Sequence, residues 1–216
     1  MSKEELYNLL VKKEKIDTFI DKINNNDLIM SLFLICENKD DITRYQAEKV
    51  IRKLSEVNPT ILYPFYDRMF NFLDSKDSFI KYGFIISIPN MLPSDLCNKW
   101  SFIRIKYLKF LTSTKVIEFS NVVKEIPIIL KYHREEEQKI IPVLLDINNH
   151  TFLNRGKLSH KCIDIAKSAI MDCFYKIYEH SKYKDEIMLF VLENKNSKKS
   201  QIVNKANRFI KKYGGK

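Results

Sequence analysis

The chain has 216 residues, of which 45% are hydrophobic and 30% are charged, a balance that is typical of a folded globular protein and excludes a disordered one. Four glycines and six prolines are too few turn-forming residues for a protein built of many short strands. The formal net charge is +10, and most of it comes from residues 151–216, where fifteen Lys or Arg face six Asp or Glu, so we expect this third of the chain to attract anionic partners.

The first predicted helix begins at a capping box. Ser2 and Glu5 have the spacing at which each side chain caps the other's backbone N–H group, and apolar residues then recur at helical spacing as far as Ile23. The first five residues lack an apolar core, so we expect no signal peptide. The longest apolar stretch, residues 29–36, is too short to span a membrane, and we therefore expect a cytoplasmic protein without a membrane span.

Helical periodicity continues along the rest of the chain, and strand signals are weak because the apolar runs belong to longer 3.6-residue patterns. Asn58 and Pro59 are typical of an N-cap followed by the first helical position. Residues 148–157 break the periodicity and predict a loop insertion. The expected helices cover about 27–36, 41–57, 59–73, 78–91, 93–111, 112–132, 135–147, 158–180, 182–194 and 198–213, the last as a basic capping helix. We predict an all-α fold.

A small residue recurs inside these predicted helices at intervals of 36, 37, 46 and 40 residues. Close approach of two helices requires such a residue, and this spacing is the period of stacked helical hairpins. The pattern therefore predicts an α-solenoid. The five positions are Ala47, Gly83, Ser120, Ala166 and Ala206.

Two prolines follow small residues by six or seven positions, which predicts a recurrent kink late in the helix. With these prolines, the chain resembles the HEAT/armadillo-like helical repeat superfamily from about residue 40 to 213. The resemblance implies that residues 1–216 form a single solenoid domain of about five stacked antiparallel helix pairs. The matching positions are residues 44–47, 81–83 with Pro89, and 119–121 with Pro127.

The same resemblance implies a non-enzymatic scaffold that binds a macromolecular partner, usually a protein, on its concave helical face. The concave wall would be formed by the helices near 60–73, 96–111, 135–147 and 182–194. The exposed candidates on this wall are Arg68, Asn71, Lys99, Lys106, Lys109 and Lys184.

The predicted helix over residues 96–111 has two different sides. Phe102 and Ile105 lie among lysines, either as part of an interface or packed against a neighbouring repeat. The opposite side is apolar and is expected to be core. Its residues are Leu96, Trp100, Ile103, Tyr107, Phe110 and Leu111.

The last predicted helix is amphipathic and basic. Such a stripe either contacts phosphate groups or anionic surfaces, or supplies the polar outer face that a terminal repeat requires. Together with an arginine of the predicted loop, it gives the candidate anion or nucleic-acid contacts. These are Arg155, Lys198, Lys205, Arg208, Lys211 and Lys212.

The competing hypothesis is a DNA-binding protein that uses this basic carboxy-terminal third and is similar to the alkylation-repair DNA glycosylases, a HEAT-like group. Those enzymes hold the lesion with several tryptophans and a carboxylate, whereas here Trp100 is the only tryptophan and the residue one helical turn after it is Arg104.

The four histidines lack metal-ligand spacing, and the four cysteines are expected to be buried thiols. We therefore expect no metal, no cofactor and no catalytic constellation.

Overall fold

The computed structural model describes residues 1–214, and within them it is helical apart from one short β-hairpin. This confirms the prediction of an all-α fold. No helix in the described range has the length and apolar character needed to cross a membrane. The backbone contacts fall into two compact units, Met1–Arg104 and a second that begins at Ile105.

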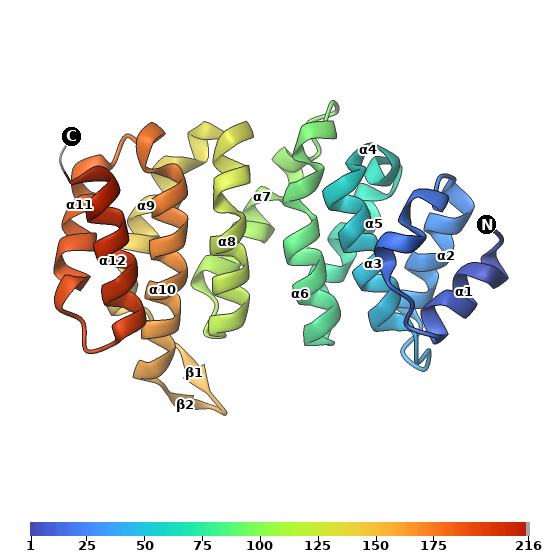
Figure 1. The fold of residues 1–216 in the computed structure, drawn as a ribbon, viewed down its shortest axis with the longest axis horizontal. Helices are drawn as coiled ribbons and strands as arrows, with labels where there is room; N and C mark the ends of the chain where they lie inside the picture. The colour runs from blue at the N-terminus through green and yellow to red at the C-terminus, as the bar shows by residue number, and fades with distance from the viewer. Residues whose placement is uncertain (215–216) are drawn as a thin grey trace. The chain divides into compact units, whose positions relative to one another are not determined.

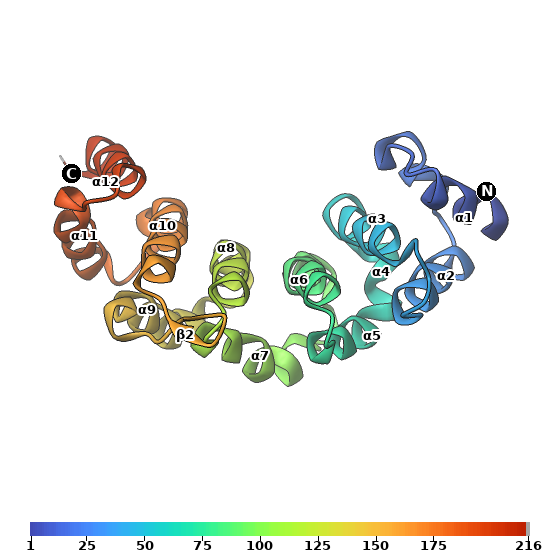
Figure 2. The same ribbon diagram turned by 90° about the horizontal axis from the view of Figure 1, so that it is seen from below.

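In the first unit, α3 packs against α2 on one side and against α6 on another, and both views show α3 and α6 side by side (Figures 1 and 2). Short 3-10 turns connect several of the helices. The helices of this unit are α1 (Lys3–Val11), α2 (Asn26–Glu37), α3 (Arg44–Val57), α4 (Pro59–Leu62), α5 (Tyr66–Asn71) and α6 (Ser78–Ser87), and α7 (Trp100–Leu108) contains the division between the units.

In the second unit, α10 packs between α8 and α12, while α9 contacts α11 (Figure 2). The helices are α8 (Val116–Tyr132), α9 (Glu137–Leu145), α10 (His160–Ile177), α11 (Lys184–Glu193) and α12 (Ser200–Tyr213), and the hairpin strands are β1 (Leu153–Asn154) and β2 (Lys157–Leu158).

In the first unit α3 and α6 run parallel, as do α10 and α12 in the second, and their contacting residues are more than 30 positions apart in sequence. Near the start of α3, Tyr45 Oη donates to Asp77 Oδ2 at 2.8 Å, and near its end Asn90 Nδ2 donates to Ser55 Oγ at 3.1 Å. In the second unit, Tyr213 Oη of α12 donates to the carbonyl oxygen of Tyr175 in α10 at 2.9 Å. The partners of these bonds are 32 to 38 residues apart, close to the period of the small residues.

All five recurring small residues are buried, as close helix packing requires. At Gly83 the requirement is strict, because a Cβ atom built there would overlap the carboxyl group of Glu48. The absence of a side chain at Gly83 therefore leaves the space that the Glu48 carboxyl group of α3 occupies against α6.

Several helices differ in extent from their predictions. The single helix predicted over 59–73 is divided into α4 and α5 by a 3-10 turn at Tyr63–Phe65, where Pro64 has no N–H group to donate. The first predicted helix ends at Val11, not near Ile23, because Lys13 adopts a left-handed conformation (φ 54°) and the N–H groups of Lys13 and Glu14 bond back to Leu10 and Leu9 in a Schellman motif. The predicted helix over 93–111 begins at Trp100, because the Asp95 carboxylate accepts the N–H groups of residues 99 and 100 at 2.8 Å.

The two prolines do not occupy equivalent places. Pro127 lies inside α8 as predicted, but α6 ends at Ser87 and Pro89 begins a 3-10 turn. The prediction of a proline inside both helices is therefore wrong for Pro89. The missing N–H group of proline ends one helix and is tolerated in the longer one.

The predicted loop over residues 148–157 carries the hairpin. Leu153 pairs with Leu158, and the turn between the strands uses positive φ angles at Arg155 (51°) and Gly156 (78°). Phe152, which is fully buried, anchors the hairpin against Phe119, with ring centroids 5.4 Å apart. The hairpin is thus held to the second unit by an aromatic contact that the weak strand signal did not predict.

Burial corrects three expectations. Leu96, expected in the core, is 92% exposed, and Phe110 is half-buried, while Trp100 and Tyr107 are fully buried as predicted. Phe102 and Ile105 are 84% and 74% exposed, so the interpretation that these two side chains pack against a neighbouring repeat is wrong.

Three of the four thiols are buried, and Cys97 is exposed, contrary to the expectation for this residue. Burial raises the pKa of Cys36 and of Cys173 well above the usual range. Both groups are therefore uncharged thiols at neutral pH, and Cys36 Sγ lies 3.6 Å from the carbonyl oxygen of Arg44.

Candidate functional site

A groove between α3 and α6 is the best-formed candidate site in the first unit. Each helix contributes four residues with the spacing i, i+3, i+4 and i+7, so two facing stripes line a hollow of about 450 Å³. The α3 stripe is Tyr45, Glu48, Lys49 and Arg52, and the α6 stripe is Phe79, Tyr82, Gly83 and Ile86. We call this the α3–α6 groove.

Two aromatic rings form one end of the α3–α6 groove. Tyr45 and Phe79 meet edge to face with their centroids 5.9 Å apart, and Phe79 is 74% exposed. Asp77 fixes this end, since it caps α6 through the N–H groups of residues 79 and 80 and accepts the Tyr45 hydroxyl. Burial opposes ionisation of Asp77, but these hydrogen bonds and the nearby Arg44 guanidinium hold its pKa below the ordinary value.

Glu48 lies at the base of the α3–α6 groove. It is 7% exposed, and its Oε1 atom has no hydrogen-bond partner of good geometry among residues 1–214, although Arg52 Nε lies 3.2 Å away. Burial raises the pKa of Glu48 to about 7, against the lowering effect of Arg52 and Lys49. At neutral pH the group is divided between an acid that can donate a hydrogen bond and a carboxylate that can accept one.

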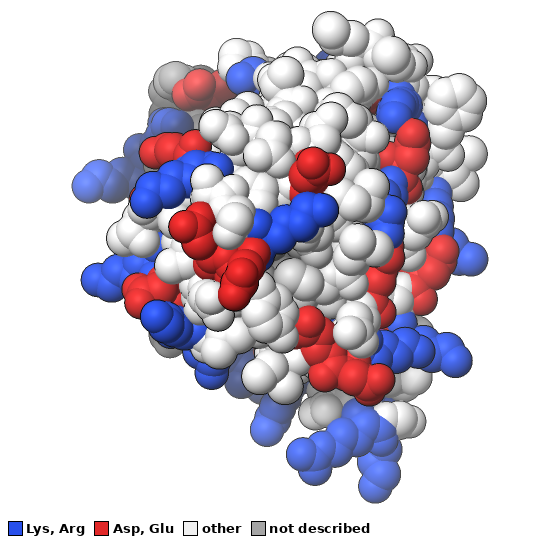
Figure 3. All heavy atoms as spheres, turned by 90° about the vertical axis from the view of Figure 1, so that its right-hand side faces the viewer, with Lys and Arg blue, Asp and Glu red and all other residues white. Residues whose placement is uncertain are grey.

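Basic side chains continue beyond the rim of the α3–α6 groove. Lys49 and Arg52 also line an adjoining hollow of about 420 Å³, where Lys53 forms an ion pair with Asp17 at 3.2 Å. Figure 3 shows that acidic and basic side chains alternate on the amino-terminal end of the molecule. The groove rim is therefore locally basic without being part of a large field of one sign.

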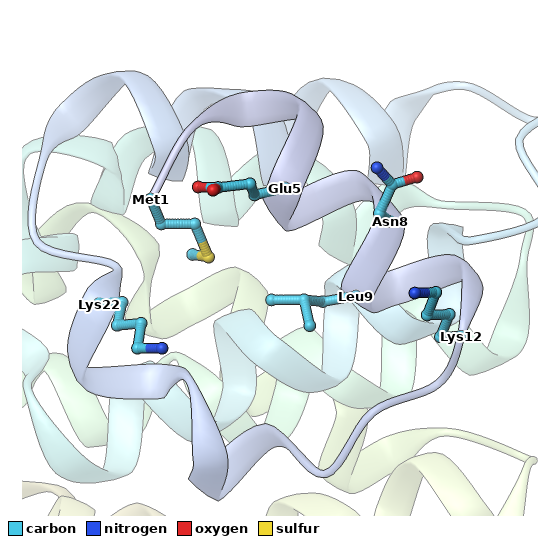
Figure 4. Close-up of a pocket in the computed structure, with 6 residues that line it drawn as sticks. All are labelled: Met1, Glu5, Asn8, Leu9, Lys12 and Lys22. Carbon is cyan, nitrogen blue, oxygen red and sulfur yellow. The ribbon is translucent and has the colours of Figure 1, made fainter.

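A third hollow, of about 500 Å³, lies beside α1 (Figure 4). Met1 and Leu9 point toward each other across it, and Lys22 lies on the same side of the hollow as Met1. The carboxylate of Glu5 already caps the helix by accepting the N–H group of Ser2 at 2.7 Å. The remaining polar residues of its lining are Asn8, Lys12 and Lys22, and Met1 and Leu9 supply its apolar contact.

Two of the six predicted partner-binding residues are used within the fold. Arg68 makes a bidentate pair with Glu37, at 2.8 and 2.6 Å, and Lys99 Nζ lies 2.6 Å from Asp67 Oδ2. Both pairs join residues 31 or 32 positions apart, and so connect α5 to the end of α2 and to the residue before α7. The other four, Asn71, Lys106, Lys109 and Lys184, are exposed.

The basic helix α12 directs part of its charge toward α10. Asp172 binds both Lys205 Nζ, at 2.5 Å, and Arg208 Nη2, at 3.1 Å. Lys205 also donates to Ser168, and Lys212 lies 3.7 Å from Glu179. The remaining candidate anion contacts, Arg155, Lys198 and Lys211, are exposed.

Sequence reasoning did not identify the α3–α6 groove, although a signal existed. The stripes on the two helices have the same spacing, 34 residues apart, one mostly charged and the other mostly apolar, and the second contains the small residue Gly83. Among residues 1–214, no three His, Cys, Asp or Glu side chains gather as metal ligands.

No family model, curated protein or solved structure shows significant similarity to this chain. A function therefore has to be inferred from the geometry of the chain itself. Three features bear on the function: the α3–α6 groove, the exposed apolar and basic side chains, and the ion pairs in which several of the predicted cationic contacts already take part.

Proposed function

We propose that this chain is a non-enzymatic scaffold with a HEAT-like stack of helix pairs, and that it binds a protein partner. The stacking is supported by parallel neighbouring helices whose hydrogen-bond partners are one repeat apart. In this proposal the α3–α6 groove receives a segment of the partner. The exposed residues of the predicted concave wall offer further contacts in each unit taken by itself, Asn71 in the first and Lys106, Lys109 and Lys184 in the second.

The observation that carries the proposal is the exposed ring of Phe79 above a closed groove base. An aromatic residue in this position gains free energy when a partner covers it, about 25 cal/mol for each Å² of apolar surface removed from water. Aromatic anchors flanked by cations are typical of the residues that dominate protein interfaces. Tyr45 and the half-buried Tyr82 extend this surface along the groove.

The rim charges define the chemistry of the partner segment. Lys49 and Arg52 favour carboxylates on the segment, while the Tyr45–Phe79 pair favours an apolar side chain. A short acidic segment with one aromatic or aliphatic anchor meets both requirements. The nucleic-acid hypothesis has less support, because Lys205, Arg208 and Lys212 are paired with carboxylates of α10 and its 3-10 turn.

The test is a selection of 12-residue peptides displayed on phage against the full chain, followed by fluorescence polarisation with the selected peptides. We expect acidic peptides with an apolar anchor, and we expect Phe79→Ala to weaken their binding about tenfold or more. Phe102→Ala is the matched control, because it removes the same side chain from a similarly exposed site on α7.

Three results would contradict the groove as the binding surface. The first is that no peptide is enriched above background. The second is equal affinity of the peptides for wild type and Phe79→Ala. The third is a loss of binding in Phe102→Ala alone, which would move the contact surface to α7. Binding of mixed-sequence duplex DNA, but of no peptide, would favour the nucleic-acid hypothesis instead.

A further inference from the structure

A second hollow, independent of the α3–α6 groove, lies in the second unit where the carboxy-terminal ends of α8 and α10 lie side by side (Figures 1 and 2). It measures about 620 Å³. Its floor is apolar and is formed by Pro127, Leu130 and Ile177. We call it the α8–α10 pocket.

Every charged residue that lines the α8–α10 pocket is basic. Lys131 comes from the last turn of α8, Arg134 from the 3-10 turn after it, and Lys176 from the last turn of α10. His180 completes the rim from the next 3-10 turn. Three elements therefore bring cationic groups to one apolar hollow.

Cations near helix ends also have a structural explanation, since they interact favourably with the negative end of the helix dipole. This explains one lysine on each helix, but it requires neither a shared hollow nor Arg134. Among residues 1–214, neither Lys131 nor Lys176 forms an ion pair, and both are exposed. Lys131 Nζ lies 5.4 Å from the centroid of the Tyr132 ring, a contact that neutralises no charge, so both ammonium groups keep a charge that a ligand can use.

Arg134 is only partly used by the fold. Its Nε atom lies 3.4 Å from Glu137 Oε2, while its buried Nη2 atom has no hydrogen-bond partner within residues 1–214. A buried donor without a partner is rare in folded proteins. A ligand oxygen that drew the guanidinium toward the α8–α10 pocket would give this donor a partner.

We propose that the α8–α10 pocket binds a phosphate monoester carried on an apolar group. The dianionic phosphate is held by Lys131, Arg134 and Lys176, and the apolar group rests on Leu130 and Ile177. A guanidinium and two ammonium groups match a group with several acceptor oxygens and two negative charges. A single apolar floor matches one ring or short aliphatic chain.

The test is a chemical-shift titration of the ¹⁵N-labelled full chain with phenyl phosphate at low salt. We expect saturable shifts at the backbone amides around Lys131 and Lys176, and binding that weakens as salt is added. The double variant Lys131→Gln/Lys176→Gln should bind at least tenfold more weakly. Lys161→Gln, which removes an exposed lysine of α10 outside the pocket, should bind as wild type does.

The double variant avoids a difficulty with Arg134, whose removal would leave the buried Glu137 without its cation. Absence of saturable shifts up to 10 mM phenyl phosphate would overturn the proposal, as would unchanged binding by the double variant. Equal binding of the uncharged probe benzyl alcohol would also overturn it, because the cations would then have no part.

Phosphate monoesters occur both on small molecules and on proteins, and a second titration distinguishes these sources. It uses a nine-residue peptide with one central phosphotyrosine. Binding at least tenfold tighter than that of phenyl phosphate identifies a phosphorylated protein segment as the ligand. Equal or weaker binding identifies a small phosphorylated molecule. Both results support the pocket, provided that the double variant abolishes them.

Discussion

Replacement of Glu48 by glutamine should remove a pH dependence of stability from the first unit. Burial raises the pKa of this carboxyl from 4.5 to about 7 in the folded chain. The folded state therefore keeps a proton that the unfolded state loses, so this stabilisation is fully present below pH 4.5 and is lost as the pH rises through 7. At 1.36 kcal/mol per pKa unit, the loss between pH 4 and 8 is about 3 kcal/mol.

The assay is urea unfolding followed by the fluorescence of Trp100, the only tryptophan, which is fully buried in the first unit. The measured quantity is the difference in unfolding free energy between Glu48→Gln and wild type at pH 4, 6 and 8. We expect this difference to shift in favour of the variant by about 3 kcal/mol from pH 4 to pH 8.

The control for this experiment is Glu56→Gln, which removes an exposed carboxyl from the same helix. The difference between this variant and wild type at the same three pH values is the baseline. If the Glu48→Gln difference varied with pH no more than this baseline, Glu48 would titrate normally in the folded chain. The groove base would then be wetter or more strongly paired with Arg52 than its burial indicates.

Three further predictions concern packing. Gly83→Ala should destabilise the fold by roughly 1–3 kcal/mol, because its Cβ would overlap Glu48. Adding Glu48→Ala should remove most of that cost in thermal unfolding. If the costs of the two substitutions were simply additive, the contact would be contradicted. Phe152→Ala should lower the free energy of unfolding by about 3–4 kcal/mol and speed amide hydrogen exchange in the β-hairpin. Unchanged exchange would show that the buried ring does not anchor the hairpin. Asp172→Asn should lower the free energy of unfolding in urea by about 1 kcal/mol, because Lys205 loses its carboxylate partner. This loss should be smaller at high salt, which screens the ion pair. If wild type and variant were equally stable at both salt concentrations, the ion pair would not contribute.

The sequence was sufficient for the helices whose ends carry standard signals. The helix predicted over 41–57 is α3, Arg44–Val57, and the helix predicted over 198–213 is α12, Ser200–Tyr213. It was insufficient where an unusual residue makes the boundary. Lys13 ends α1 in a left-handed conformation that usually belongs to glycine, so an apolar pattern that continues to Ile23 concealed the break.

The sites were harder to predict than the helices, because a charged side chain on one helix is paired or left exposed by residues of another helix far away in sequence. Periodicity shows which side of a helix a residue occupies, but the partner on the next helix is a repeat away in sequence. Lys205 and Arg208 look like free cations on a polar stripe until α10 brings Asp172 against them. Glu48 looks like one more surface carboxyl until Gly83 brings α6 over it.

The same relation explains why the repeat spacing is informative about function as well as fold. Polar partners at 31 to 38 residues hold neighbouring helices in register, and they use up side chains such as Arg68 and Lys99 that would otherwise be available to a partner. Some exposed side chains lie outside these polar pairs. Phe79 on α6 is one, since its ring contacts Tyr45 and is still 74% exposed, and Lys131 and Lys176 at the α8–α10 pocket are two others. Binding is therefore best sought at exposed side chains that the polar pairs between helices leave out, and the Phe79→Ala and Lys131→Gln/Lys176→Gln variants test that rule in two separate units of one chain.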